Sequence, residues 1–151
     1  MSTDKSNRLS RSVIPSHYDL TIKTDLKRQT FAGTCEILLE IHEAIPSITI
    51  HAGSPLKFSS AVLAPLEANG QIAESRRSLN IKIDEATQRA EIVFEGGEIT
   101  QGSYKLGCKW EGALGTNTVG YFCASFVAPD ESDDKKEFYT MTQFQPCQSS
   151  P

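Results

Sequence analysis

The chain has 151 residues, which is enough for one domain with a sizeable core. Hydrophobic residues make up 38% of it and charged residues 23%, as in ordinary soluble globular proteins. The formal net charge is -4, and Lys and Arg occur at most in isolated pairs, so the composition argues against binding to nucleic acid. No run approaches the ~18 apolar residues that a membrane-spanning helix needs.

The start of the chain and the cysteines bear on its location. The stretch MSTDKSNRLSRSVIP lacks the apolar core of a secretory signal. Cys35, Cys108, Cys123 and Cys147 are widely spaced and form no CxxC pair. We therefore expect a cytoplasmic protein with reduced thiols, and we interpret the first three cysteines as small core residues.

Hydrophobic and polar residues alternate through most of the chain. In residues 17–23 (HYDLTIK), Tyr18, Leu20 and Ile22 share one face. In residues 31–42 (FAGTCEILLEIH), one face is apolar or small and the other is largely polar. This period of two predicts antiparallel strands with one face on a core and one toward water.

The same alternation continues to the end of the chain. Residues 79–94 predict a hairpin in which DEATQ forms the turn. Further strands are expected at residues 47–52, 56–63, 102–112, 120–129 and 137–144. Roughly eight to ten strands without a substantial helix predict an all-β fold, with antiparallel sheets in a saddle-like or sandwich arrangement.

Residue types that support catalysis are sparse. His17, His42 and His51 do not have the spacing of a hydrolytic metal site, which often uses His residues at i and i+4 of a helix. The sequence contains neither a GxSxG motif nor a phosphate-binding glycine loop. Trp110 alternates with Cys108 and is interpreted as a core residue, with a sugar-stacking platform as the alternative. We expect no catalytic residue and no metal ligand in this chain.

Two amide side chains stand near the end of the last expected strand. Gln143 and Gln145 are two residues apart and therefore point to the same face of a strand. They either face solvent without a role or offer paired donors and acceptors to a ligand. The residue pattern leaves both interpretations open.

Four segments carry a more specific pattern. The first is residues 8–41, with its "V.P.HYDL" and "DL....F.G" matches, and the others are SITIHA (47–52), GYFCASF (120–126) and YTMTQFQP (139–146). In order and spacing they resemble the start of zinc aminopeptidases of the aminopeptidase N type, particularly the puromycin-sensitive, cytosolic branch. The matching positions in the first segment are Leu9, Val13, Pro15, His17, Tyr18, Asp19, Leu20, Asp25, Leu26, Phe31 and Gly33.

The resemblance implies a saddle-shaped N-terminal β domain at residues 12–146, between flexible tails at residues 1–11 and 147–151. In the family this domain packs against a catalytic domain whose HExxH motif and downstream Glu bind zinc. This sequence has neither the HExxH motif nor the GxMEN loop. Zinc is therefore expected in the full-length family enzyme and not in this chain, which is expected to be inactive alone.

The resemblance also gives Gln143 and Gln145 a role. The family's TQxE stretch helps to hold the free α-amino group of a peptide substrate. Gln143 matches the family's Gln, whereas Gln145 stands where the family usually has Glu. A neutral amide can accept a hydrogen bond from an ammonium, typically about half as strong as the bond to a carboxylate.

Alternatives of another class remain at this point. The domain could be a stand-alone interaction or ligand-binding protein, including a lectin-like one. Apolar surface left exposed would then favour self-association. The chain could also regulate a full-length enzyme by competing for its catalytic domain.

Overall fold

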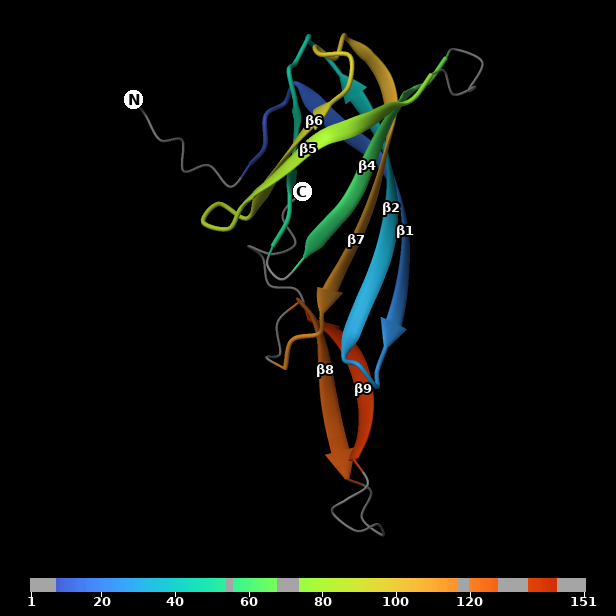
Figure 1. Ribbon diagram of the computed structural model, residues 1–151, viewed down its shortest axis with the longest axis vertical. Helices are drawn as coiled ribbons and strands as arrows, with labels where there is room; N and C mark the ends of the chain where they lie inside the picture. The colour runs from blue at the N-terminus through green and yellow to red at the C-terminus, as the bar shows by residue number, and fades with distance from the viewer. Residues whose placement is uncertain (1–7, 54–55, 68–73, 117–119, 128–135, 144–151) are drawn as a thin grey trace. The chain divides into compact units, whose positions relative to one another are not determined.

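The computed structural model describes residues 8–53, 56–67, 74–116, 120–127 and 136–143, and this part of the chain contains nine strands and no helix (Figure 1). The strands are β1 (Val13–Asp25), β2 (Thr30–Ile41), β3 (Ile48–His51), β4 (Lys57–Pro65), β5 (Arg76–Asp84), β6 (Arg89–Phe94), β7 (Gly102–Ala113), β8 (Gly120–Val127) and β9 (Lys136–Gln143). The predicted all-β class is confirmed, and the number of strands lies within the predicted range.

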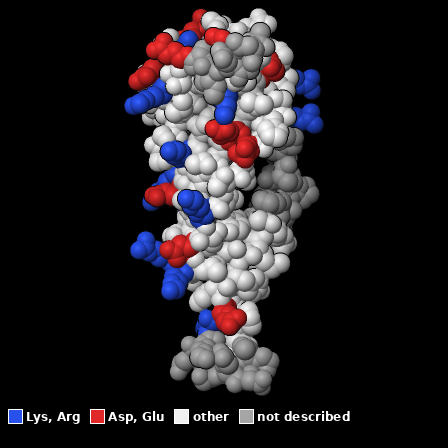
Figure 2. Space-filling view, turned by 90° about the vertical axis from the view of Figure 1, so that its right-hand side faces the viewer, with Lys and Arg blue, Asp and Glu red and all other residues white. Residues whose placement is uncertain are grey.

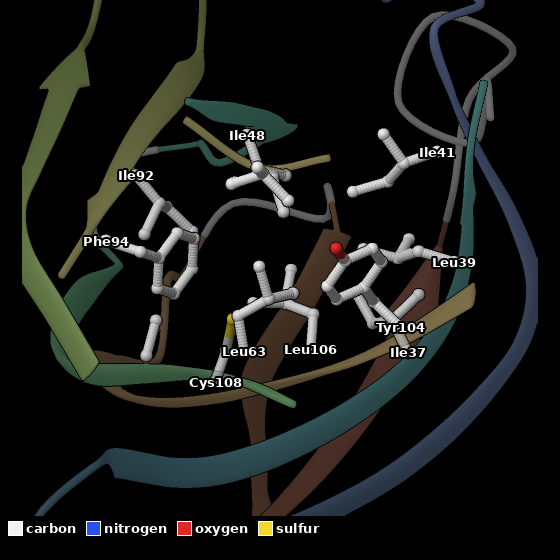
Figure 3. Close-up of a cluster of buried hydrophobic side chains, with 12 residues drawn as sticks. Ile37, Leu39, Ile41, Ile48, Leu63, Ile92, Phe94, Tyr104, Leu106 and Cys108 are labelled. Carbon is white, nitrogen blue, oxygen red and sulfur yellow. The ribbon is translucent and has the colours of Figure 1, made fainter. Parts of the chain in front are cut away.

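The first seven strands form one sheet, in the order β1-β2-β7-β4-β5-β6-β3, and β8 pairs with β9 in a second sheet. Strand β4 runs antiparallel to β5 and β7, and β6 runs antiparallel to β5 and β3. The larger sheet curls into a half-barrel, which encloses the buried side chains on its inner side (Figures 1 and 3).

The chain divides into two compact units. The main unit comprises Leu9–Lys23 and Ala32–Glu111, and the ribbon unit comprises Met1–Arg8, Thr24–Phe31 and Gly112–Pro151. The main unit contains most of the curled sheet. The ribbon unit contains β8, β9 and the turn between β1 and β2.

The core of the main unit follows directly from the alternation. Alternate residues are buried along β6, in β2 from Ile37 onward and in β7 from Tyr104 to Cys108, because successive side chains of a strand point to opposite faces. Figure 3 shows these side chains pointing toward one another across the curled sheet. The buried cluster consists of Ile37, Leu39, Ile41, Ile48, Ala61, Leu63, Ile92, Phe94, Ile99, Tyr104, Leu106 and Cys108.

The predicted hairpin at residues 79–94 is confirmed as β5 and β6. Its turn is held by Asp84, whose Oδ1 accepts hydrogen bonds from the backbone N–H groups of Ala86 and Thr87 at 3.0 and 3.4 Å. Leu79 departs from the simple pattern, since its side chain is 66% exposed. The register shifts between Ser78 and Asn80, so Leu79 lies in a β-bulge that interrupts the alternation.

Strand β1 differs from the expected half-buried strand. Tyr18 and Leu20 are each 56% exposed, and Ile22 is 42% exposed. Strand β1 is an end strand of the sheet, and of its apolar side chains only that of Val13 packs against the core cluster, so the alternation does not produce a buried face there. Pro15, which has no backbone N–H group to donate, is compatible with such an edge position.

Trp110 packs where a glycine leaves room for it. A Cβ atom on Gly33 would lie 2.7 Å from Trp110 Cζ2 and 2.9 Å from the backbone oxygen of Thr21. The indole ring also contacts Phe58, with ring centroids 6.4 Å apart. Trp110 is half-buried against the core cluster, in agreement with its interpretation as a core residue.

Candidate functional site

Gln143 is the last residue of β9, and it belongs to the two-stranded ribbon that β8 and β9 form. The register places Gln143 opposite Gly120, whose φ of +72° is a conformation that favours glycine. Gln143 is exposed, so its amide is free to donate two hydrogen bonds and to accept others. Gln145 lies outside the described residues.

The face of the ribbon that carries Gln143 is largely apolar. Because side chains alternate along a strand, Tyr139 and Met141 share this face with Gln143, and Phe126 lies on it from β8. These three side chains are 41%, 51% and 49% exposed, respectively. The rings of Phe126 and Tyr139 contact each other with centroids 6.2 Å apart. An exposed amide therefore stands at the end of an apolar strip.

Sequence reasoning singled out Gln143 and did not single out this strip. The signal was available, since Tyr139, Met141 and Gln143 follow one another at a period of two. The contribution of Phe126 could not be found in the same way, because it depends on the register between β8 and β9.

The opposite face of the ribbon is held by Tyr121. Its hydroxyl lies 2.5 Å from Thr24 Oγ1 and 3.3 Å from Thr140 Oγ1, and its ring contacts Phe31 edge-on at 5.4 Å. Thr24 and Phe31 flank the turn between β1 and β2, which is nearly 100 residues earlier in the chain. Tyr121 thus links the base of the ribbon to that turn within the ribbon unit.

Backbone hydrogen bonds complete the base of the ribbon. The N–H group of Leu114 donates to the carbonyl of Gln29 at 2.8 Å, and the N–H group of Cys123 donates to the carbonyl of Gly115 at 2.9 Å. Phe122 and Cys123 are each 5% exposed. The end of the ribbon near Gln143 is therefore anchored, whereas the other end presents exposed aromatic side chains.

The Tyr121→Phe variant is expected to lower the free energy of unfolding by about 1 kcal/mol, because it removes one hydroxyl that serves both threonines. The midpoint temperature of thermal unfolding should fall by about 2–4 °C for a chain of this size. Tyr139→Phe is the matched control, since Tyr139 is 41% exposed and should unfold as the parent does. Equal losses in the two variants would contradict the role of the Tyr121 hydroxyl.

The described residues do not fit a zinc site. They contain no group of three or more His, Cys, Asp or Glu side chains that could hold a metal ion. His17, His42 and His51 are exposed and lie on or next to three different strands.

The cysteines of the described part, Cys35, Cys108 and Cys123, are free thiols. Burial, and to a smaller extent Cys35, raises the pKa of Cys108 to about 12. The pKa of Cys35 is also raised, by burial and then by Asp19 and Glu36. Both thiols stay protonated near neutral pH, so neither is suited to act as a nucleophile or thiolate ligand.

Cys108 should make stability depend on alkaline pH. Its pKa is raised in the folded chain, so the folded state holds the proton that the unfolded state releases first. The stabilisation from the Cys108 thiol is complete below about pH 8.5, which is the ordinary pKa of a thiol. It is lost as the pH rises toward 12. Denaturant unfolding at a series of pH values should show that the free energy of unfolding falls as pH rises over this range. The dependence on pH should be weaker in the Cys108→Ala variant. The same slope in both proteins would contradict this assignment.

A hollow of about 390 Å³ on the main unit is the other candidate for a ligand site. Its lining includes the charged residues Asp19, Glu36 and Lys109. Glu36 is already engaged, because its Oε2 lies 2.7 Å from Lys105 Nζ. Charges of both signs and two protonated thiols do not select one class of ligand, so Gln143 and its strip remain the better candidate.

Comparison with known proteins places this all-β chain in a family. Residues 14–150 match the peptidase M1 N-terminal domain, which covers most of the chain, and the chain belongs to this family. The resemblance found in its four sequence segments is thereby confirmed.

The similar curated proteins include fungal aminopeptidases. The chain is 27% identical over 141 residues to "Aminopeptidase 2, mitochondrial" of Saccharomyces cerevisiae and 25% identical over 138 residues to Aminopeptidase 2 of Candida albicans. It is 26% identical over 140 residues to the alanine/arginine aminopeptidase of Saccharomyces cerevisiae. Each match covers 91% of this chain but only 13% to 15% of the relative.

The described part of the chain contains no helix with the length and apolar character needed to cross a membrane.

Proposed function

We propose that this chain is the non-catalytic N-terminal β domain of a cytosolic zinc aminopeptidase. It would pack against a catalytic domain, shape the substrate entrance and contribute to recognition of the peptide N-terminus. The observation that carries the proposal is the family match over residues 14–150, together with relatives that are named aminopeptidases. Zinc would be bound by the catalytic domain, because the described residues of this chain offer no ligand group for it.

Gln143 and Gln145 are the proposed contacts for the substrate's amino group. Gln143 is exposed at the anchored end of the ribbon, which supports a role in contacting a ligand from outside. The carbonyl oxygen of an amide can accept a hydrogen bond from an ammonium without contributing a charge. The exposed strip of Tyr139 and Met141 on the same face could contact an apolar part of the substrate or the catalytic domain.

A chimaera tests this role. The chain would replace the matching stretch of the Saccharomyces cerevisiae Aminopeptidase 2. Active chimaera carrying Gln143→Ala or Gln145→Ala should show KM raised about tenfold for amino-acid amides, because a hydrogen bond to a charged group contributes about 1.5 kcal/mol. Gln145→Glu should lower KM, since a carboxylate attracts the ammonium more strongly.

The control is Gln101→Ala, which changes an exposed glutamine outside the ribbon. A Gln143→Ala chimaera that behaves like the Gln101→Ala chimaera would refute the role of Gln143. The separate 151-residue chain should not turn over amino-acid amides in the presence of zinc. Robust turnover by the chain alone would refute the non-catalytic assignment.

A second candidate is a stand-alone interaction protein that reuses the same domain and associates with itself. The observation in its favour is the large apolar side chains that are exposed on β1 and on the ribbon. A lectin-like role is less favoured, because Trp110 packs against Phe58 and Gly33. Binding on a glycan array would be the result that restores it.

A further inference from the structure

Strand β1 is a long edge of the curled sheet. It comes first in the strand order, so only β2 pairs with it among the described strands. The strand has 13 residues, and nearly all of their side chains are exposed. Figure 2 views the molecule from the side on which β1 forms the edge in Figure 1, and charged side chains lie among uncharged surface on this side. A long exposed edge with apolar side chains can accept another strand.

The residues of β1 are complementary to the same residues in a second copy. In an antiparallel pair with its twofold axis at Thr21, Asp19 of each copy lies opposite Lys23 of the other. Leu20 of each copy lies opposite Ile22 of the other on the opposite face of the strands. The apolar side chains of the two copies therefore lie side by side on that face. The same register brings His17 opposite Asp25.

Neighbouring registers lack this match. An axis at Leu20 would place Asp19 opposite Thr21 and His17 opposite Lys23. An axis one residue beyond Thr21, at Ile22, would place Asp19 opposite Asp25 and would therefore bring like charges together. A shift by an odd number of residues would place apolar side chains opposite polar ones. Among these registers, the one centred on Thr21 joins both the Asp19–Lys23 pairs and the apolar rows.

We propose that the edge of β1 binds the β1 edge of a second copy of this chain, in the antiparallel register centred on Thr21. The two curled sheets then form one continuous sheet. Two Asp19–Lys23 ion pairs select the register, and Leu20 with Ile22 buries apolar surface on the other face. The occupant is a second copy because the match is between the strand and itself.

Sedimentation equilibrium over a concentration series tests the proposal on the 151-residue chain. The parent chain should form dimers. Asp19→Lys and Lys23→Glu should each raise the dimer dissociation constant about tenfold, because each variant turns two attractive pairs into two repulsive ones. The double variant, Asp19→Lys with Lys23→Glu, reverses both signs and should return to within about twofold of the parent.

Lys57→Glu is the control, because it makes the same charge change on β4, an interior strand that is flanked on both sides. It should dimerise as the parent does. Raised salt should weaken the parent dimer, since the ion pairs are exposed. A monomeric parent, single variants that dimerise like the parent, or a double variant that stays as weak as the single ones would overturn the proposal. None of these outcomes depends on the aminopeptidase role.

Discussion

The Leu63→Ala variant is expected to lose about 2–5 kcal/mol of unfolding free energy, the range measured for truncating a buried leucine. Leu63 is fully buried on β4 and lies opposite Leu106 of β7, where both belong to the core cluster (Figure 3). Removing its side-chain carbons leaves a cavity that the surrounding strands can fill only in part. Because a domain of this kind has a total stability of about 5–15 kcal/mol, urea unfolding should show a much lower midpoint.

Leu79→Ala is the matched control for this experiment. It removes the same atoms from a leucine that is 66% exposed in the β5 bulge. We expect its unfolding midpoint to stay close to that of the parent chain. A Leu63→Ala variant that unfolds at the same urea concentration as Leu79→Ala would mean that the curled sheet does not enclose a packed core.

The Gly33→Val variant is expected to lose about 1–3 kcal/mol or more, the usual cost of forcing extra atoms into a packed site. The new Cβ would lie 2.7 Å from Trp110 Cζ2 and 2.9 Å from the backbone oxygen of Thr21. The indole ring can move only by giving up contacts with Phe58 and the core, and the Thr21 oxygen belongs to the neighbouring strand. The midpoint temperature of thermal unfolding should fall by several degrees.

Gly53→Val serves as the control, because no atom lies within 4 Å of a Cβ built on Gly53. If steric crowding is the cause, only the Gly33 variant should be strongly destabilised. The near-ultraviolet circular dichroism of Trp110 should change in that variant as well. Equal stability of the two variants would show that the space over Gly33 is not filled by the indole ring.

The strands could be predicted well from the sequence because their signal is local. Alternation with a period of two marks β2, β5, β6 and β7, and turn residues separate them, so element type follows from neighbouring residues alone. The four-segment resemblance was sufficient for the family, which the match over residues 14–150 confirms. The prediction that Gln143 contacts a substrate rests on its position in one of these segments.

The structure was needed wherever distant residues meet. Alternation predicts that Tyr18, Leu20 and Ile22 share a face but cannot tell that β1 is an edge, because strand order depends on pairings across the whole chain. Likewise, the bulge at Leu79 is a property of the register between two strands. The joining of Tyr121 to Thr24 and Phe31 brings together residues that are nearly 100 positions apart.

By itself, the sequence determined the all-β class, most of the strands and the membership of the peptidase family. Those properties rest on short-range periodicity and on residue identities at matching positions. The tertiary structure decided which apolar faces form the core, which remain exposed on β1 and β9, and what stands beside Gln143. Burial depends on which strands become neighbours, and that is decided by the packing of the whole chain.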